Sequence, residues 1–272
     1  MQPPKILFGT GVSAAKDYSS MKKLVKTALQ YGITGFDAAP SYGSEELLGN
    51  VLEELQKDLS INRNQFFIQT KIDPWQMQLG FENIQSMVIE TLKKMKLNYF
   101  DSLLIHWPIP EYFIETWSCL ESLKREDVVR YIGISNLRKR QLEKYASIGI
   151  SPDIIQIERN PLNICADEVD YCSKNNIILQ GYSPLCKMNK KISDNKYLKD
   201  LSDKYNKSIG QIVLRYHLDS GICPVFTSKK VDRVSEYACI FDFKLEDFEV
   251  TKIDELNENY KMYLESWSCP GF

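Results

Sequence analysis

The sequence of 272 residues predicts a closed (β/α)8 barrel, the TIM barrel fold, formed as a single domain over residues 1–272. Short apolar runs alternate with amphipathic stretches, as parallel strands alternate with crossover helices. Eight such pairs fit into a chain close to the roughly 250 residues typical of this barrel. A doubly wound open sheet is the alternative, because it also begins with β–α alternation. Eight pairs without a linker or low-complexity break favour the barrel.

The expected strands are short apolar runs without the strict alternation of a half-exposed sheet. Burial on both faces, as in a parallel sheet covered by helices, explains such runs. One run opens with "SPDIIQIE", and its Ser-Pro start favours an extended conformation. In chain order the expected strands cover residues 6–11, 35–39, 65–71, 100–106, 130–135, 154–158, 177–183 and 222–227.

The stretches between these runs have the pattern of amphipathic helices. "SEELLGNVLEELQ" begins at Ser44, whose hydroxyl we expect to cap the helix, and it carries two glutamates in its first turn. "FENIQSMVIETLKKMKL", residues 81–97, places apolar side chains on one face at a 3.6-residue period. "SIGQIVLRYHL" repeats the pattern before the last strand. Its His217 is expected to pack or cap there, without a chemical role.

Composition and charge exclude several classes of partner. The chain is 43% hydrophobic and 26% charged, with a formal net charge of −2. These values are typical of an ordinary globular protein and give no electrostatic attraction to nucleic acid or to an anionic membrane. No run approaches 18 consecutive apolar residues, and the amino terminus lacks the features of a signal peptide. We therefore expect no membrane or nucleic-acid partner, and a monomer by default.

Cysteine usage indicates the compartment. The seven cysteines are odd in number, scattered, and form no CxxC pair. Such a pattern in a chain of this length is typical of reduced, buried thiols. We expect a cytoplasmic protein with neither a disulfide framework nor a metal site.

Polar residues stand at or just beyond the ends of three consecutive expected strands. Asp37 ends the second strand and Tyr42 follows it, Lys71 ends the third, and His106 ends the fourth. In a (β/α)8 barrel the carboxyl ends of the strands and the loops after them line the active site. Each residue alone could be structural, since strand ends carry many polar side chains. The set of four on adjacent strands is much harder to explain as packing.

These four residue types together suit proton transfer to a carbonyl oxygen. A free tyrosine has a pKa of about 10, too high for rapid proton donation at neutral pH. We expect the Lys71 ammonium to lower the pKa of Tyr42, and Asp37 to keep that ammonium charged and aimed. His106 beside the phenol could orient a carbonyl oxygen by a hydrogen bond. A hydride arriving at the carbonyl carbon would then leave a neutral alcohol.

Six motifs follow one another between residues 7 and 245. They are "GFDAAPSYGSEELLG", "IQTK", "YFDSLLIHWP", "RYIGISN", "IIQIERNPL" and "LQGYSPL". In this order, with five residues from Asp37 to Tyr42, they resemble the aldo-keto reductase superfamily. The resemblance implies that Tyr42 is the general acid of a catalytic tetrad and that His106 orients the substrate carbonyl. The implied tetrad is Asp37, Tyr42, Lys71 and His106.

The same resemblance implies a nicotinamide cofactor. Ser135, Asn136 and Gln156 match positions that hydrogen-bond the nicotinamide carboxamide. Tyr182 matches the ring on which the nicotinamide stacks, and Ser183 and Leu185 match the pyrophosphate loop. Asn136, Gln156 and Tyr182 could each equally be structural, as a turn, a strand end and a core ring.

The segment "FTSKKVDRVSEY" bears on the choice between the two nicotinamide dinucleotides. Ser228 and Arg233 match residues of NADPH-binding relatives, but Thr227 and Tyr237 stand where those relatives often carry lysine and asparagine. Arg233 could bind a 2′-phosphate bidentately, with Lys229 and Lys230 nearby. A solvated basic helix start is the alternative interpretation. NADPH is therefore favoured, and NADH stays possible.

Three departures from the family pattern concern the substrate. Asp73 stands where many relatives carry tryptophan, and Asn160 where histidine is frequent. The loops after His106 and Tyr182 are short, as is the tail. We infer an open and comparatively polar mouth, bordered by Trp75 and Trp107, although both tryptophans could instead anchor the barrel rim.

The leading hypothesis is NADPH-dependent reduction of aldehydes or ketones, with Tyr42 as general acid and small or polar carbonyl compounds as substrates. One alternative is a sugar or polyol dehydrogenase that uses NAD or NADP. Another is a cofactor-binding regulatory subunit without turnover, against which the intact set of four residues argues. The natural substrate, the pathway and the physiological direction do not follow from the sequence.

Overall fold

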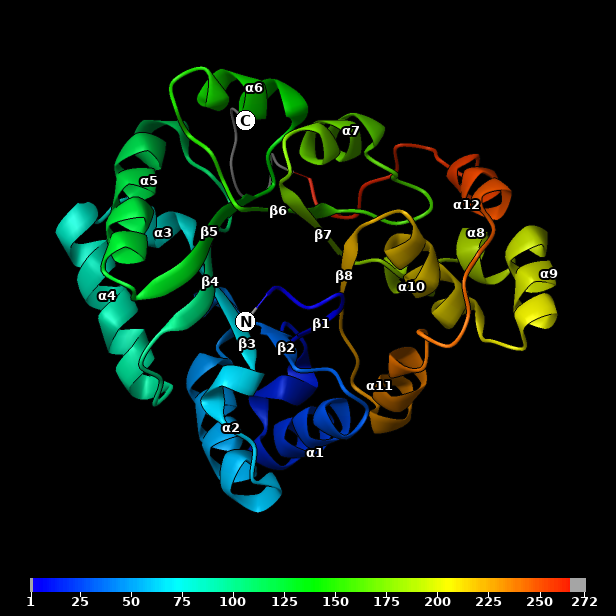
Figure 1. The fold of residues 1–272 in the computed structure, drawn as a ribbon, viewed down its shortest axis with the longest axis horizontal. Helices are drawn as coiled ribbons and strands as arrows, with labels where there is room; N and C mark the ends of the chain where they lie inside the picture. Colours follow the sequence, from blue (N-terminus) through cyan, green and yellow to red (C-terminus); the bar gives the residue numbers. More distant parts are fainter. Residues whose placement is uncertain (1, 265–272) are drawn as a thin grey trace.

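Eight parallel strands form a closed barrel in the computed structural model, which describes residues 2–264 (Figure 1). The predicted fold class is confirmed. Each strand pairs with the next in the chain, and β8 closes the barrel on β1 through Leu7 opposite Val225 and Phe8 opposite Phe226. The strands are β1 (Leu7–Gly9), β2 (Gly35–Asp37), β3 (Phe67–Ile72), β4 (Phe100–Ile105), β5 (Val129–Ser135), β6 (Ile154–Glu158), β7 (Ile178–Tyr182) and β8 (Cys223–Phe226).

The expected strands are all present, but several are shorter than predicted. The second was expected over residues 35–39, yet β2 ends at Asp37. Pro40 then opens a 3-10 turn, η2 (Pro40–Tyr42), and proline has no N–H for the strand ladder. The chain therefore bends away from the barrel just after Asp37, which brings Tyr42 back over the strand end.

Helices surround the barrel on its outside (Figure 1). None of those in residues 2–264 is both long and apolar enough to cross a membrane. The α-helices are α1 (Tyr18–Gln30), α2 (Glu45–Leu59), α3 (Pro74–Met77), α4 (Phe81–Lys94), α5 (Pro110–Arg125), α6 (Lys139–Ala146), α7 (Ala166–Lys174), α8 (Lys190–Ser193), α9 (Lys196–Tyr205), α10 (Ile209–Asp219), α11 (Val231–Ala238) and α12 (Asp247–Asp254). The other 3-10 turns are η1 (Ser13–Lys16), η3 (Arg63–Gln65) and η4 (Cys186–Met188).

The barrel interior changes from apolar to polar along the strands. Side chains alternate between the two faces of a strand, so residues 67, 69 and 71 of β3 share one face. Near the amino ends of the strands, Phe67 packs with Leu7, Leu104 and Ile154. Towards the carboxyl ends the buried residues are polar: Asp37, Gln69, Lys71, Gln156 and Gln180. This two-residue alternation places a polar layer at the end of the barrel where the four candidate residues stand.

Two helix predictions have different outcomes. Ser44 is the N-cap residue of α2, but its side chain makes no capping hydrogen bond, so the predicted hydroxyl cap is wrong. The buried Ser44 hydroxyl lies 2.8 Å from the hydroxyl of Thr10 and forms a hydrogen bond with it instead of capping the helix. His217 is fully buried on α10, as expected, and its ring nitrogens contact the carbonyl oxygens of Val213 and Arg159 at 2.8 and 3.0 Å.

Gly49 lies where α2 packs closely against the chain after α4. A Cβ at this position would lie 2.4 Å from both Cα and the carbonyl oxygen of Met95. Helix propensity alone favours alanine over glycine by about 1 kcal/mol. We predict instead that Gly49→Ala lowers the free energy of unfolding by about 1–3 kcal/mol, because backbone atoms cannot yield to the added methyl group.

Denaturant unfolding measures this effect, with Asn50→Ala, one position along the same helix and half-buried, as the control. The control should be neutral or slightly stabilising. A Gly49→Ala protein as stable as the original would contradict the close packing of α2.

Candidate active site

A buried ion pair joins β2 and β3 at the polar end of the barrel. The ammonium nitrogen of Lys71 lies 2.7 Å from each carboxylate oxygen of Asp37. The Lys71 side chain has no exposed surface and that of Asp37 is 4% exposed. Both residues point into the barrel because Asp37 pairs with Gln69 in the β2–β3 register, and Lys71 follows Gln69 by two positions on the same face.

The same ammonium reaches Tyr42. It donates to the carbonyl oxygen of Ala38 at 3.0 Å and lies 3.4 Å from the Tyr42 hydroxyl oxygen. A lysine ammonium has three N–H donors, and here they serve a carboxylate, a carbonyl and a phenol. Gly43, in a left-handed conformation (φ 63°), ends the η2 turn that carries Tyr42. A Cβ on Gly11 would lie 3.4 Å from the Tyr42 ring, so the chain passes closely along that ring.

The structure contradicts the expectation that Lys71 lowers the pKa of Tyr42. Burial raises the pKa of Tyr42 well above its ordinary value, and the carboxylates of Asp37 and Asp73 add to the effect. The physical reason is that the pairing of Lys71 with both oxygens of Asp37 offsets part of its positive charge, so the ammonium does not outweigh burial. Tyr42 is therefore held in its protonated form, which is the form that can donate a proton.

His106 follows β4 and lies beside Tyr42. The two rings meet edge to face, with centroids 5.7 Å apart. The ring nitrogen Nδ1 of His106 lies 2.5 Å from a carboxylate oxygen of Asp73. Burial lowers the pKa of His106, and the hydrogen bond with Asp73 opposes part of that shift.

A cavity of about 300 Å³ opens where these side chains meet. Asp37, Tyr42, His106 and Trp107 line it. All four candidate catalytic residues are thus brought together, since Lys71 lies directly behind Asp37 and Tyr42. Trp75 is not in this cavity; its side chain, on α3, is 51% exposed.

Most of the residues expected to hold a nicotinamide line the same cavity. Asn136, Gln156, Tyr182 and Ser183 line it. The Tyr182 hydroxyl donates to Asn136 at 2.9 Å, and the Asn136 amide group lies 3.1 Å from the hydroxyl of buried Ser135. Asn136 and Ser183 have positive φ angles of 64° and 50°, a strained backbone conformation that is often found at functional sites.

A second cavity of about 600 Å³ extends this site along the barrel rim. It shares Gly11, Ser183, Thr227 and Tyr263 with the first cavity. Leu185, Ser228 and Arg233, all expected to contact the cofactor, line it together with Lys229. The two cavities form a groove from Tyr42 to Arg233, with polar groups at one end and basic groups at the other. Its extent and its donors fit a nicotinamide dinucleotide.

Comparison with known proteins agrees with this geometry. The family model described as "Aldo/keto reductase family" matches residues 5–258. The chain belongs to the aldo/keto reductase family. It is therefore an oxidoreductase that acts on carbonyl groups with a nicotinamide cofactor.

Curated relatives of this aldo/keto reductase include two named for small dicarbonyl compounds. A glyoxal reductase of Bacillus subtilis is 33% identical over 256 residues, covering 94% of this chain and 90% of the relative. A methylglyoxal reductase of Escherichia coli is 32% identical over 257 residues, covering 93% and 90%. Among solved structures, a Bombyx mori aldo-keto reductase in complex with NADP is 30% identical, with a TM-score of 0.88, and the match covers 97% of this chain and 92% of that one.

Two residues of the aldo/keto reductase site were not identified from the sequence. Tyr263 lines both cavities and meets the Tyr182 ring edge to face at 5.9 Å. Glu158, at the end of β6, holds this segment in place by accepting from the backbone N–H groups of Met262 and Tyr263 at 2.8 and 2.9 Å. Tyr263 belongs to no recognisable motif. Glu158 could have been identified from the sequence, because a glutamate at the end of a buried strand is unusual enough to indicate a specific contact.

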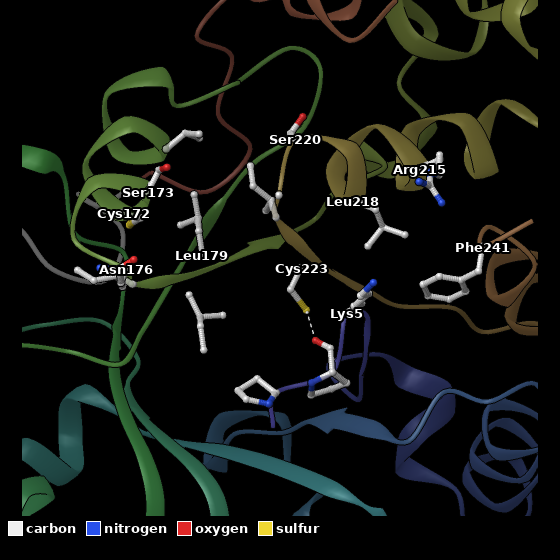
Figure 2. A pocket seen from close by; sticks show the side chains of 17 residues that line it. Lys5, Cys172, Ser173, Asn176, Leu179, Arg215, Leu218, Ser220, Cys223 and Phe241 are labelled. Carbon is white, nitrogen blue, oxygen red and sulfur yellow. Dashed lines mark hydrogen bonds between the residues drawn. The ribbon is translucent and has the colours of Figure 1, made fainter. Parts of the chain in front are cut away.

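A different cavity of about 550 Å³ lies at the amino ends of β7 and β8 (Figure 2). Cys223, Lys5, Leu218 and Phe241 surround it, and the Cys223 thiol contacts the carbonyl oxygen of Pro4 at 3.3 Å. Although this cavity is larger than the one beside Tyr42, the buried ion pair and the paired rings are at the other end of the barrel. The aldo/keto reductase chemistry therefore belongs to the carboxyl end. Within residues 2–264, no group of three or more His, Cys, Asp or Glu residues could hold a metal ion.

The Asp37–Lys71 pair makes a specific prediction about stability. Lys71→Met leaves the Asp37 carboxylate buried without its counter-ion, and we expect a loss of about 3–5 kcal/mol in the free energy of unfolding. The double variant Asp37→Asn, Lys71→Met removes both charges and should recover much of that loss. Denaturant unfolding of the single and double variants measures the coupling between the two residues. Additive losses would contradict a direct pairing of these charges.

Proposed function

We propose that this protein reduces small or polar aldehydes and ketones to alcohols with NADPH, using Tyr42 as the general acid. The observation that carries the proposal is the contact of Lys71 with both Asp37 and Tyr42 at the wall of the cavity. A tyrosine held beside an ammonium, in a cavity that also contains the candidate nicotinamide residues, is arranged for proton donation to an oxygen.

The reaction adds two electrons and two hydrogens to the C=O group. A reduced nicotinamide bound in the groove would supply a hydride to the carbonyl carbon. As negative charge develops on the carbonyl oxygen, the Tyr42 hydroxyl transfers its proton there, and the C–O double bond becomes a single bond. Because burial keeps the pKa of Tyr42 high, the proton stays on the phenol until this oxygen becomes basic.

The neighbours of Tyr42 would stabilise the phenolate that this transfer leaves. The Lys71 ammonium is 3.4 Å from the phenol oxygen and cannot move away without breaking its bonds to Asp37. A fixed positive charge in a buried site stabilises the negative charge of a phenolate more strongly than the ammonium of a water-exposed lysine would. His106 would orient the carbonyl from the adjacent wall, with Trp107 beside it.

Different residues of the groove would bind different parts of the dinucleotide. Tyr182 would stack on the nicotinamide, and the polar groups of Ser135, Asn136 and Gln156 would bind its carboxamide. Ser183 and Leu185 would follow the pyrophosphate, while Ser228 and Arg233 would contact the adenosine end. In support, the Asn136–Tyr182 hydrogen bond fixes the ring and the amide relative to each other.

The basic end of the groove favours NADPH over NADH. Arg233 and Lys229 both line it and could pair with a 2′-phosphate. Arg233 also pairs with Glu236 at 2.7 and 2.9 Å, which keeps the guanidinium directed along α11. The relative from Bombyx mori was solved with NADP.

The size of the cavity favours small substrates. Its volume of about 300 Å³ is bounded by a histidine, a tyrosine and a tryptophan. The glyoxal and methylglyoxal reductases among the relatives support two- and three-carbon dicarbonyl compounds as the first substrates to test.

We predict that Tyr42→Phe reduces kcat for methylglyoxal by about 100-fold or more, because the proton donor is lost. The Kd for NADPH, measured by quenching of tryptophan fluorescence, should stay the same. Tyr31→Phe, at an exposed site that does not line the cavity, is the matched control and should keep full activity. Turnover by Tyr42→Phe at the original rate would remove Tyr42 from this role.

The cofactor preference has its own test. Arg233→Ala should raise the Kd for NADPH about tenfold or more and leave the Kd for NADH unchanged, because only NADPH carries the 2′-phosphate. Lys252→Ala, a lysine to alanine change on α12, should alter neither value. Equal effects of Arg233→Ala on the two cofactors would contradict a 2′-phosphate contact.

A further inference from the structure

Asp73 and His106 form a carboxylate–imidazole pair that follows directly from the strand register. Ile72 pairs with Ile105 in the β3–β4 ladder, so the next residue of each strand lies beside the other. The backbone N–H of His106 also donates to the Ile72 carbonyl at 2.9 Å. Both residues are buried: 2% of the surface of Asp73 and 9% of the surface of His106 is exposed.

The Asp73 carboxylate is fixed by a second set of contacts. The backbone N–H of Ser41 donates to Oδ2 at 2.7 Å, and the Ser41 hydroxyl lies 3.3 Å from Oδ1. Burial acts to raise the pKa of Asp73, but the hydrogen bonds from His106 and Ser41 outweigh it and hold that pKa below its ordinary value. Asp73 is therefore ionised at neutral pH, and an ionised carboxylate can only accept hydrogen bonds.

A carboxylate that can only accept determines the tautomer of His106. Nδ1 lies 2.5 Å from Asp73 Oδ1 and must carry a hydrogen. A neutral imidazole has one N–H, so in that state Nε2 carries none and can only accept. A carbonyl oxygen also only accepts, and it cannot bind to such a nitrogen. A hydroxyl group can.

We propose that Asp73 is a positioning residue that makes His106 a donor to a carbonyl only when the imidazole is doubly protonated, and an acceptor for an alcohol when it is neutral. This inference rests on the proposed function of the site. Carbonyl reduction is then favoured by a proton on His106, and alcohol oxidation by its loss. The Asp73–His106 pair thus couples the direction of the reaction to pH.

The groups around His106 determine the pH at which its imidazolium loses a proton. Asp73 and Asp37 favour the imidazolium, whereas burial and the Lys71 ammonium disfavour it, and the Tyr42 and His106 rings meet edge to face. Burial is the largest effect, so the pKa of His106 lies below its ordinary value. As pH rises through that pKa the imidazolium is lost, so kcat/KM for carbonyl reduction should fall. The inflection is expected on the acid side of neutrality.

The nearly isosteric variant Asp73→Asn reverses the tautomer. The Ser41 backbone N–H still requires an acceptor, so the asparagine oxygen should occupy the Oδ2 position. Its NH₂ group then faces Nδ1, which must accept, and the neutral imidazole carries its hydrogen on Nε2. In this variant the neutral His106 can donate to a carbonyl. Reduction should therefore lose its dependence on His106 protonation and persist at higher pH.

Nitrogen chemical shifts of the imidazole rings test the tautomer without any turnover. The chain has only two histidines, and burial beside Arg159 lowers the pKa of His217 to about 3, so the His217 ring should stay neutral while His106 is followed at higher pH. His106→Asn assigns the signals. At pH values above the inflection of His106, where its imidazole is neutral, we expect Nδ1 to be protonated in the original protein and unprotonated in Asp73→Asn. Ser41→Ala keeps the backbone N–H and should retain the original tautomer.

The pH profile of methylglyoxal reduction gives the second readout. In the original protein kcat/KM should fall by up to about tenfold per pH unit above the His106 pKa, and this inflection should be absent in Asp73→Asn. An unprotonated Nδ1 in the original protein, or the same tautomer and profile in both proteins, would overturn the inference. A protein with the expected tautomers but no carbonyl turnover would instead contradict the proposed function.

Discussion

A buried ion pair between Lys71 and Asp37 is the interaction on which the active end of the barrel depends. Burying two charges is costly unless each is paired and hydrogen-bonded. Asp37 meets this requirement with both its oxygens on Lys71 and with amide donors from Gln69 and Gln156 at 2.6 and 3.2 Å. Gln180 in turn exchanges hydrogen bonds with Gln69 at 2.9 and 3.0 Å. The polar layer is therefore one connected network, and it fixes the Lys71 ammonium beneath the phenol of Tyr42.

The barrel itself produces this arrangement by simple alternation. On β3, Phe67 belongs to the apolar interior, Gln69 to the amide layer, and Lys71 to the ion pair behind the wall of the site. Residues two apart share a face, so one strand contributes to all three layers. The loops after the strands then add Tyr42 and His106 above the ion pair, and two left-handed residues, Asn136 and Ser183, turn the chain along the cofactor groove.

Much of this architecture was predictable because it depends on local patterns. Apolar runs identified all eight strands, and the position of polar residues at strand ends identified Tyr42 and His106 as neighbours. The sequence could not show contacts that arise only in three dimensions. Asp73 was interpreted as a change at the substrate mouth, whereas the β3–β4 register places it against His106. The pKa of Tyr42 was predicted in the wrong direction, because burial and the pairing of Lys71 with Asp37 outweigh the nearby ammonium.

Other expectations concern properties that contacts within the described chain do not test. The single domain, the monomeric state and the cytoplasmic location stay predictions. Trp75 shows that closeness to a motif in the sequence does not place a residue in the cavity. It is two residues from Asp73, yet its side chain, on α3, is exposed to solvent. Tyr263, far along the chain from every motif, reaches the cavity because Glu158 binds the backbone beside it.

A crystal structure of the protein with bound NADP⁺ tests most directly whether the reaction takes place above the Asp37–Lys71 pair. The account predicts that the nicotinamide lies against Tyr182 in the cavity lined by Tyr42 and His106, and that the adenosine end lies near Arg233. A dinucleotide bound at the amino ends of β7 and β8, or a nicotinamide out of reach of the Tyr42 hydroxyl, would contradict it.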